Sequence, residues 1–216
     1  MSHPYWPFFD LVVRTPRLEL RYPTDEQLVE VADLAARGIH PPDVMPFTVP
    51  WTDAPSPGLE RSTLKHHWGL RAGLTAESWG LAFVTVVDGA IVGMQSIHGK
   101  DFAVTKTVET GSWLGMAHQG QGLGKEMRAA VLHLAFAGLG AQVAFSGASV
   151  DNEQSMGVSR ALGYEDDGFL VVAVRGQAQR EIRFRLERER WEERRRDDIV
   201  IEGLAPCLPL LGAGGS

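Results

Sequence analysis

The segment from Ser112 to Lys125 constrains the fold of this chain more than any other. It reads SWLGMAHQGQGLGK and is followed directly by the amphipathic run EMRAAVLHLAFA. An apolar stretch, a loop with alternating glycines and a helical pattern predict the order strand, glycine-rich loop, helix. Residues without a Cβ let backbone N–H groups converge on an anion, and a helix start adds partial positive charge. The loop therefore predicts a phosphate ligand; a glycine-rich loop without a ligand is the alternative.

Two common phosphate-binding loops do not fit these residues. A Walker loop requires G-x-x-x-x-G-K followed by Ser or Thr, whereas Lys125 is followed by Glu126 and the glycine spacing is one residue short. The dinucleotide-binding fingerprint requires G-x-G-x-x-G, whereas Gly120, Gly122 and Gly124 give G-x-G-x-G. The sequence predicts neither of these nucleotide sites.

Composition limits the class of protein. The chain has 216 residues, of which 44% are hydrophobic, and this is enough for one full core. A net charge of −6 argues against a general nucleic-acid partner. The single Cys207 excludes an internal disulfide and fits a reducing compartment, and the histidines show no H-x-x-x-H spacing, so we expect no metal site.

No segment suggests export or a membrane. The N-terminus lacks a basic stretch followed by a long apolar run, and no segment reaches ~18 uninterrupted apolar residues. We therefore expect a cytoplasmic protein with no membrane partner.

The first part of the chain predicts a strand and a capped helix. Leu18–Arg21 reads as the first strand, after a turn at Thr15 and Pro16. Thr24 and Gln27 form a capping box, and the apolar spacing that follows predicts a helix ending at Gly38.

A long irregular loop follows this helix. The segment from His40 to Pro57 contains six prolines, which cannot continue a helix or a central strand. Phe47, Val49 and Trp51 are the predicted apolar anchors. A loop of this length in a compact domain is more often functional than not, and we expect it to border the substrate cleft.

The rest of the chain alternates strands and helices. Asp88-Gly89 is a two-residue hairpin signal between two strands. The predicted helices are 59–72, the run after Gly124, and 153–162; the predicted strands are 81–87, 90–97, 105–114, 142–150, 169–174 and 181–186. The charged segment 188–196 predicts a solvated helix or turn, with anion binding as the alternative.

Three motifs in order resemble the GNAT acyltransferases. Gln119, Gly122 and Gly124 match the Q/R-x-x-G-x-G/A motif of that family. The strand ETGSWL that begins at Glu109 is similar to E-I-G-Y-W-L of the RimJ/RimL-like branch, which acylates protein N-termini and other amines. Residues 151–164, with Asn152, Ser155 and a closing LGY, resemble the N-x-x-S…L-G-F/Y segment of that branch.

The resemblance covers roughly residues 15–187 and implies the fold. The family has an α+β (mixed α/β) fold, in which a largely antiparallel twisted sheet contains a splayed parallel strand pair and is flanked by helices. We expect one acyltransferase domain over residues 1–198 and a tail over 199–216. The tail is apolar to Leu211, enough to pack on a surface such as that of a partner subunit, which leaves a homo-oligomer open; we expect Gly212–Ser216 to be disordered.

The resemblance also implies how an acyl-CoA donor binds. Its pantetheine would pair with the main chain of the strand that ends at Leu114, and its pyrophosphate would bind the amides of the glycine loop. Asn152 and Ser155 could hydrogen-bond the pantetheine arm, with helix capping as the alternative role. The predicted donor-binding residues are Ser112, Trp113, Leu114, Gln119, Gly120, Gln121, Gly122, Leu123, Gly124, Lys125, Asn152 and Ser155.

Two residues are candidates for the chemistry. Glu109 stands at the glutamate of the motif strand and is the candidate base, with a structural or substrate-orienting carboxylate as the alternative. Gly147 and Ala148 on the following strand offer no carboxylate. Many GNATs place a tyrosine four residues before the LGF/Y glycine to protonate the thiolate; Ser159 stands there, as in RimL-like enzymes.

The predicted function is CoA-dependent N-acylation of a primary amine, on a protein or a small molecule. A non-catalytic CoA-binding sensor or structural partner with the same fold is the alternative. A narrower resemblance concerns the donor: MPFTVPW at 45–51, KDF at 100–102 and GSWLG at 111–115 are similar to an actinobacterial branch described as succinyltransferases. Acetyl-CoA and succinyl-CoA are thus both candidate donors, and His98 or Lys100 is a candidate contact for a succinyl carboxylate.

Overall fold

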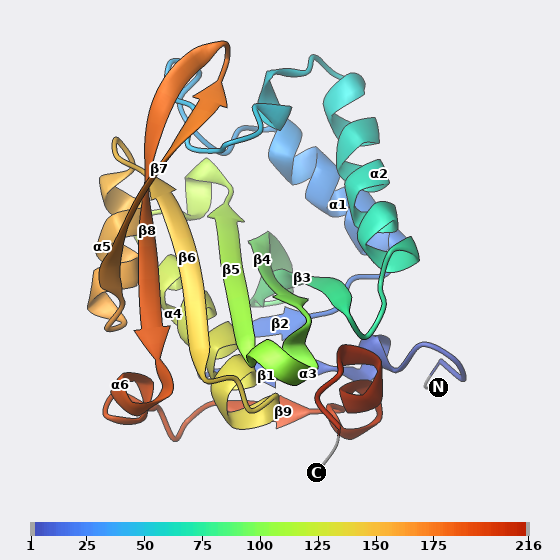
Figure 1. The fold of residues 1–216 in the computed structure, drawn as a ribbon. Coiled ribbons are helices and arrows are strands. Elements are labelled where there is room, and N and C mark those ends of the chain that lie inside the picture. Colours follow the sequence, from blue (N-terminus) through green and yellow to red (C-terminus); the bar gives the residue numbers. More distant parts are fainter. Residues whose placement is uncertain (1–2, 215–216) are drawn as a thin grey trace.

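One mixed sheet organises the molecule. The computed structural model describes residues 3–214, and its strand order is β7-β8-β6-β5-β4-β3-β2-β1-β9, with β5 and β6 as the one parallel pair in this part of the chain. Figure 1 shows the sheet with helices against it. The strands are β1 (Val12–Arg14), β2 (Glu19–Arg21), β3 (Ser78–Val87), β4 (Ala90–Lys100), β5 (Thr107–Leu114), β6 (Val143–Ser149), β7 (Glu165–Val174), β8 (Gln177–Glu187) and β9 (Val200–Glu202).

Helices cover both faces of this sheet. The helices are α1 (Asp25–Ala36), α2 (Gly58–Ala72), α3 (Phe102–Thr105), α4 (Leu123–His133), α5 (Glu153–Ala161) and α6 (Arg188–Glu192). Alternate residues of β3 pack in opposite directions: Leu81 and Phe83 join the main core with α4, whereas Ala82 and Val84 pack with Val31 of α1. This period of two places α4 on one face and α1 on the other.

Local sequence signals are confirmed where they predicted turns and caps. The Thr24 hydroxyl accepts a bond from the Gln27 amide, and the Gln27 side chain accepts one from Thr24 N–H, so the capping box starts α1. Asp88 (φ 48°) and Gly89 (φ 81°) turn the chain between β3 and β4 in left-handed conformations, as the predicted hairpin requires.

The proline-rich loop is fixed by aromatic packing and one ion pair. Phe47 lies 5.5 Å from Trp51, and Trp51 lies 6.0 Å from Trp113 of β5, between ring centroids. The prediction that Val49 anchors the loop is wrong, because this residue is 66% exposed. A bidentate pair from Arg175 to Asp53 ties the loop to the β7–β8 hairpin, so a distant hairpin holds this loop in place.

The C-terminal segment differs from its prediction as a separate tail. Strand β9 pairs antiparallel with β1, and Leu211 accepts a hydrogen bond from the Trp79 indole at 2.9 Å. Cys207 and Leu211 are fully buried in the main core. The apolar residues of this C-terminal segment pack on the domain itself. Strand β9 pairs with backbone groups of β1 that would otherwise be unpaired at the edge of the sheet. Gly212 to Gly214 lie in the described structure; the predicted disorder at 215–216 falls outside the described residues.

Two further elements also differ from the sequence prediction. Strand β1 precedes the predicted first strand and lies between β2 and β9. The charged segment at 188–196 forms α6 with a buried Trp191 that stacks on Phe136 at 5.1 Å, so it is a packed helix and not a wholly solvated one.

Candidate active site

The two parallel strands part at the centre of the sheet. Strand β5 pairs with β6 only from Thr107 to Glu109, opposite 143–145, and beyond Glu109 its described pairing is with β4 alone. Strand β6 stays bonded to β8 as far as Ser149. The edge of β5 that faces β6 therefore has no strand partner beyond Glu109. The Thr110 carbonyl accepts from the Ser146 hydroxyl at 3.3 Å and the Leu114 carbonyl accepts from Gln119, and an extended ligand can add like a strand on the backbone groups between them. The predicted Ser112, Trp113 and Leu114 lie on this edge.

The glycine loop lies where β5 ends and α4 begins. Gly120 and Gly122 have φ values of 73° and 77°, which favour glycine, and α4 starts at Leu123. The first-turn amides of α4, those of Leu123, Gly124 and Lys125, have no acceptor within a helix that starts there. A ligand phosphate at this point would meet free N–H groups and the positive end of the helix dipole.

The motif glutamine has a structural contact. The Gln119 side-chain amide donates to the carbonyl oxygens of Leu114 at 2.9 Å and Ile39 at 2.7 Å. Arg17 adds a second brace by donating to the Gln121 carbonyl at 3.1 Å. These bonds fix the loop against the end of β5 and leave its amides for a ligand.

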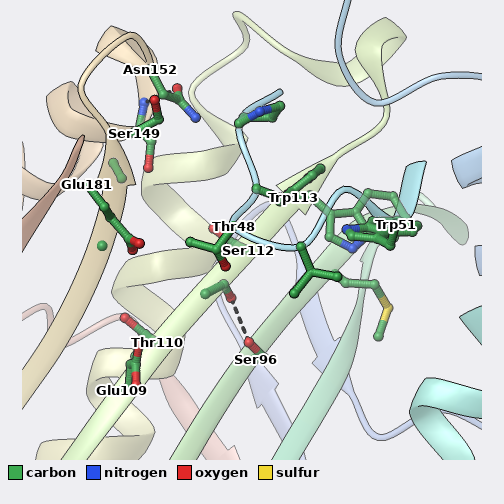
Figure 2. Close-up of a pocket in the computed structure, with 18 of the residues that line it drawn as sticks. Thr48, Trp51, Ser96, Glu109, Thr110, Ser112, Trp113, Ser149, Asn152 and Glu181 are labelled. Atoms are coloured by element: carbon green, nitrogen blue, oxygen red, sulfur yellow. Dashed lines mark hydrogen bonds between the residues drawn. The ribbon is translucent and has the colours of Figure 1, made fainter. Parts of the chain in front are cut away.

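A cavity of about 630 Å³ opens beside the parted strands. It is walled by the proline-rich loop, α2, the free edge of β5 and the start of α5. Figure 2 shows Thr48 and Trp51 of the loop, Trp113 of β5, and Asn152 at the start of α5. The proline-rich loop lines this cavity with Pro46 to Val49 and Trp51, as predicted; that it borders the acceptor end of the cleft stays a prediction. Its lining also includes Ser62, Thr63, His66, His67, Met94, Ser96, Glu109, Thr110, Gly111, Ser112, Trp113, Arg128, Gly147, Ser149, Asn152, Ser155, Gln179, Arg180 and Glu181.

Two carboxylates line this cavity from strands on either side of the opening. Glu109 is exposed on β5 at the point where pairing with β6 ends, and Glu181 is half-buried on β8. A Cβ built on Gly147 of β6 would overlap the Glu181 carboxylate, so the missing side chain at 147 lets Glu181 reach across β6 toward the opening (Figure 2). Burial first, and the Glu109 charge second, raise the pKa of Glu181 above its usual range.

The histidines near the cavity are held neutral. Burial lowers the pKa of His67 to about 4, with smaller contributions from His66 and Arg71. Burial also lowers the pKa of His98, against an opposing effect of Glu109, its cross-strand partner. His98 is not among the lining residues, and Lys100 is an exposed residue at the far end of β4. Neither His98 nor Lys100, the predicted contacts for a succinyl carboxylate, lines this cavity. The arginines that line it are Arg128 and Arg180.

The segment after β6 supplies a helix cap and a buried hydroxyl. The Asn152 carbonyl oxygen accepts from Ser155 N–H at 3.0 Å, so the capping role is confirmed, and both residues line the cavity. Ser159 is 1% exposed, its hydroxyl has no partner among residues 3–214, and it is not a lining residue. Tyr164, predicted as a core residue, is buried, with its hydroxyl 3.1 Å from that of Thr110.

A parted parallel strand pair and a glycine loop at a helix start are the two features that the acyltransferase motifs predicted. A family model described as the acetyltransferase (GNAT) domain matches residues 17–165, and this chain belongs to that family. The predicted family and α+β fold are confirmed. Within residues 3–214 no helix is long and apolar enough to cross a bilayer.

Solved structures share the fold at low sequence identity. Mycobacterium smegmatis RimJ in complex with a CoA disulfide has a TM-score of 0.68 and 19% identity, over 85% of this chain and 90% of that one. RimL, a ribosomal L7/L12 alpha-N-protein acetyltransferase in complex with CoA, gives 0.63 and 17%, over 82% and 97%. A spermidine N-acetyltransferase SpeG chimera from Vibrio cholerae and hSSAT gives 0.63 and 14%, over 82% and 99%. At these identities the likeness shows the fold.

Sequence reasoning missed several residues of the cavity, and two of them, Arg128 and Glu181, bear on its chemistry. Arg128 lies one position after Met127 on α4, where a charged residue reads as solvent-facing, yet it is 3% exposed. Glu181 begins the predicted final strand and carried no motif. Glu181 could have been recognised only together with Gly147. Because glycine has no side chain, position 147 of β6 leaves room for the carboxylate of Glu181 from β8.

Proposed function

We propose that this protein is a CoA-dependent N-acyltransferase that moves an acetyl or succinyl group to a primary amine by direct attack. The observation that carries the proposal is the parting of β5 and β6 beyond Glu109, next to the free amides at the start of α4. An extended pantetheine arm fits the first feature and a pyrophosphate fits the second. Membership of the acetyltransferase family supports the same donor.

The two carboxylates of the cavity indicate which kind of acceptor it can bind. Glu109 and Glu181 give the cavity two anionic groups, and an ammonium acceptor would be attracted to them. One of the two must take a proton before the amine can attack. Glu181 suits this role as well as the motif residue Glu109, because its raised pKa makes it a stronger base. Glu109 then orients the ammonium. Ser159, the candidate proton donor from the sequence, does not line the cavity, so we assign it no proton transfer. RimJ and RimL support a protein amine as acceptor and SpeG supports a small one.

The donor assay separates the candidates. Purified protein is incubated with acetyl-, propionyl- or succinyl-CoA and a panel of peptide and polyamine acceptors, and released thiol is measured. Arg128 or Arg180, which line the cavity, would supply the contact for a succinyl carboxylate. Acyl transfer to any amine supports the proposal. CoA binding without turnover on the whole panel supports the non-catalytic sensor instead.

A glycine variant tests the donor site. A Cβ at Gly124 would meet Leu114 and Val158 only at ordinary contact distances of 3.8 and 3.9 Å, so Gly124→Val should fold. Its side chain would crowd a bound pyrophosphate, and we expect CoA affinity measured by calorimetry to fall by about 100-fold, the loss of a few charge-assisted hydrogen bonds. Gly157→Val on exposed α5 is the matched control, since nothing lies within 4 Å of a Cβ there. Equal CoA affinity in both variants would remove the proposed donor site.

A further inference from the structure

Arg128 is a buried cation that bridges the two parted strands. Its guanidinium donates to the Ser146 hydroxyl of β6 at 2.8 Å and to the Ser112 hydroxyl of β5 at 3.0 Å. The residue is 3% exposed and lines the cavity from the α4 side of the sheet. The guanidinium therefore lies at the opening between β5 and β6, where the proposed donor would place its thioester.

The charge of Arg128 is not neutralised by the protein. Over residues 3–214 no carboxylate forms an ion pair with it, and its partners are neutral hydroxyls. The Nε–H group is buried and has no acceptor in the same part of the chain. Burying an uncompensated cation costs several kcal/mol. An anion bound beside the guanidinium would offset part of this cost.

Acyl transfer generates one anion at this place. When the amine nitrogen attacks the thioester carbon, the C–N bond forms, the C–S bond breaks and its electron pair goes to sulfur. A free thiol has a pKa near ~8.5, and a cation within ~4–6 Å lowers such a pKa by about 1–3. A serine hydroxyl is a weak acid, and Ser159 is not a lining residue of the cavity.

We propose that Arg128 stabilises the CoA thiolate as it leaves, so that sulfur departs as an anion paired with the guanidinium. The inference rests on the proposed acyl-CoA donor and assigns Arg128 a catalytic role. The ammonium acceptor loses one proton to Glu181 before attack, and the nitrogen loses its second proton to solvent after the C–N bond has formed. The thiolate takes a proton from solvent on release, which balances the reaction.

Other charged groups face the same opening. Glu109 of β5 and Glu181 of β8 raise the pKa of a nearby thiol, and His67 of α2 is held neutral by burial. Tyr164 packs beside Arg128, and burial raises the pKa of its phenol, so it stays neutral. Arg180 lines the cavity from β8, with its guanidinium 3.9 Å from the Phe169 ring centroid. The effect of Arg128 must therefore be isolated by variants at this position alone.

The test compares the wild type with Arg128→Lys and Arg128→Met while CoA is bound at saturation. The thiol pKa of bound CoA is read from the ultraviolet absorbance of the thiolate, and calorimetry gives the CoA affinity. In the wild type we expect the thiol pKa of bound CoA to lie at least about one pH unit below that of free CoA. The thiol pKa should be similar in Arg128→Lys, and in Arg128→Met it should rise toward that of free CoA. The kcat for acetyl transfer should fall at least about tenfold in Arg128→Met. Arg160→Met, which removes an exposed arginine of α5, is the control and should match the wild type.

Stability gives a second and independent readout. Removal of an uncompensated cation should leave the Tm of Arg128→Met at or above that of the wild type. Identical thiol pKa values in wild type and Arg128→Met overturn the inference, and so does a Tm loss with unchanged pKa. Weaker CoA binding with an unchanged thiol pKa would assign Arg128 to the pantetheine and also overturn it. Wild-type protein that fails to bind CoA removes the proposed function as well, which distinguishes the two failures.

Discussion

The neutral His67 predicts how the protein responds to acid. His67 is 8% exposed on α2, and burial, then His66 and Arg71, lower its pKa from 6.5 to about 4. Between these two pH values the unfolded chain binds a proton at this residue and the folded chain does not. Stability is therefore highest above pH 6.5, falls as the pH drops from 6.5 to about 4, and levels off below that. The gap of about 2.5 between the two pKa values corresponds to about 3 kcal/mol.

The experiment compares the pH dependence of unfolding in wild type and His67→Leu. Urea unfolding followed by tryptophan fluorescence at pH 7.5, 6.5, 5.5 and 4.5 gives the free energy at each pH. The wild type should lose about 2–3 kcal/mol more than His67→Leu between pH 7.5 and 4.5, because leucine has no proton to bind. Other titrating groups are common to both proteins and cancel in the difference. His3→Leu, at an exposed position, is the control.

The comparison depends on slopes and not on the absolute stability of the variant. His67→Leu can lose or gain stability at pH 7.5 without affecting the reasoning. Parallel free-energy profiles for the two proteins would show that His67 binds its proton as readily in the folded state as in the unfolded chain, and would refute the argument from burial.

Further predictions concern the carboxylates and the first helix. Glu181→Gln should lower kcat/KM by about 100-fold and leave a rate that rises with pH toward the pKa of the free amine, since no base would remain for the ammonium; an unchanged pH–rate profile would assign the base to Glu109. Gly147→Ala should reduce the same rate, and in the Glu181→Gln background it should add nothing, which a double-mutant cycle of initial rates would show. Thr24→Ala should destabilise the domain by about 1 kcal/mol in urea, against no change for the exposed control Thr48→Ala in the proline-rich loop.

Local chemistry explains the parts of the fold that could be predicted. The capping box at Thr24, the hairpin at Asp88-Gly89 and the glycine loop each depend on a few adjacent residues. Helix α4 and the long strands have enough apolar periodicity to be visible. The short strands β1 and β9 were not predicted, because they pair with each other across a long separation in sequence.

The same distinction applies to the site. The free edge of β5 and the loop amides follow the order of motifs along the chain. Arg128 could not be placed, because its burial depends on the opening between two strands and on hydroxyls at 112 and 146. Glu181 could not be placed either, because its backbone pairs with Ser149 and only its side chain extends over Gly147. Position 49 shows the converse: a valine between two aromatic anchors reads as apolar packing but faces solvent.

The pairing of β1 with β9 sets an order of events during synthesis. Strand β1 ends at Arg14, and its outer partner is not made until residue 202 has been added. Throughout most of translation the outer edge of β1 is therefore open, and the Trp79 indole lacks its acceptor, the Leu211 carbonyl. A nascent chain with an unpaired edge can pair with a neighbour on the same messenger RNA. Strand β9 thus covers an edge that a chain shortened before residue 200 would leave open to pairing with other molecules.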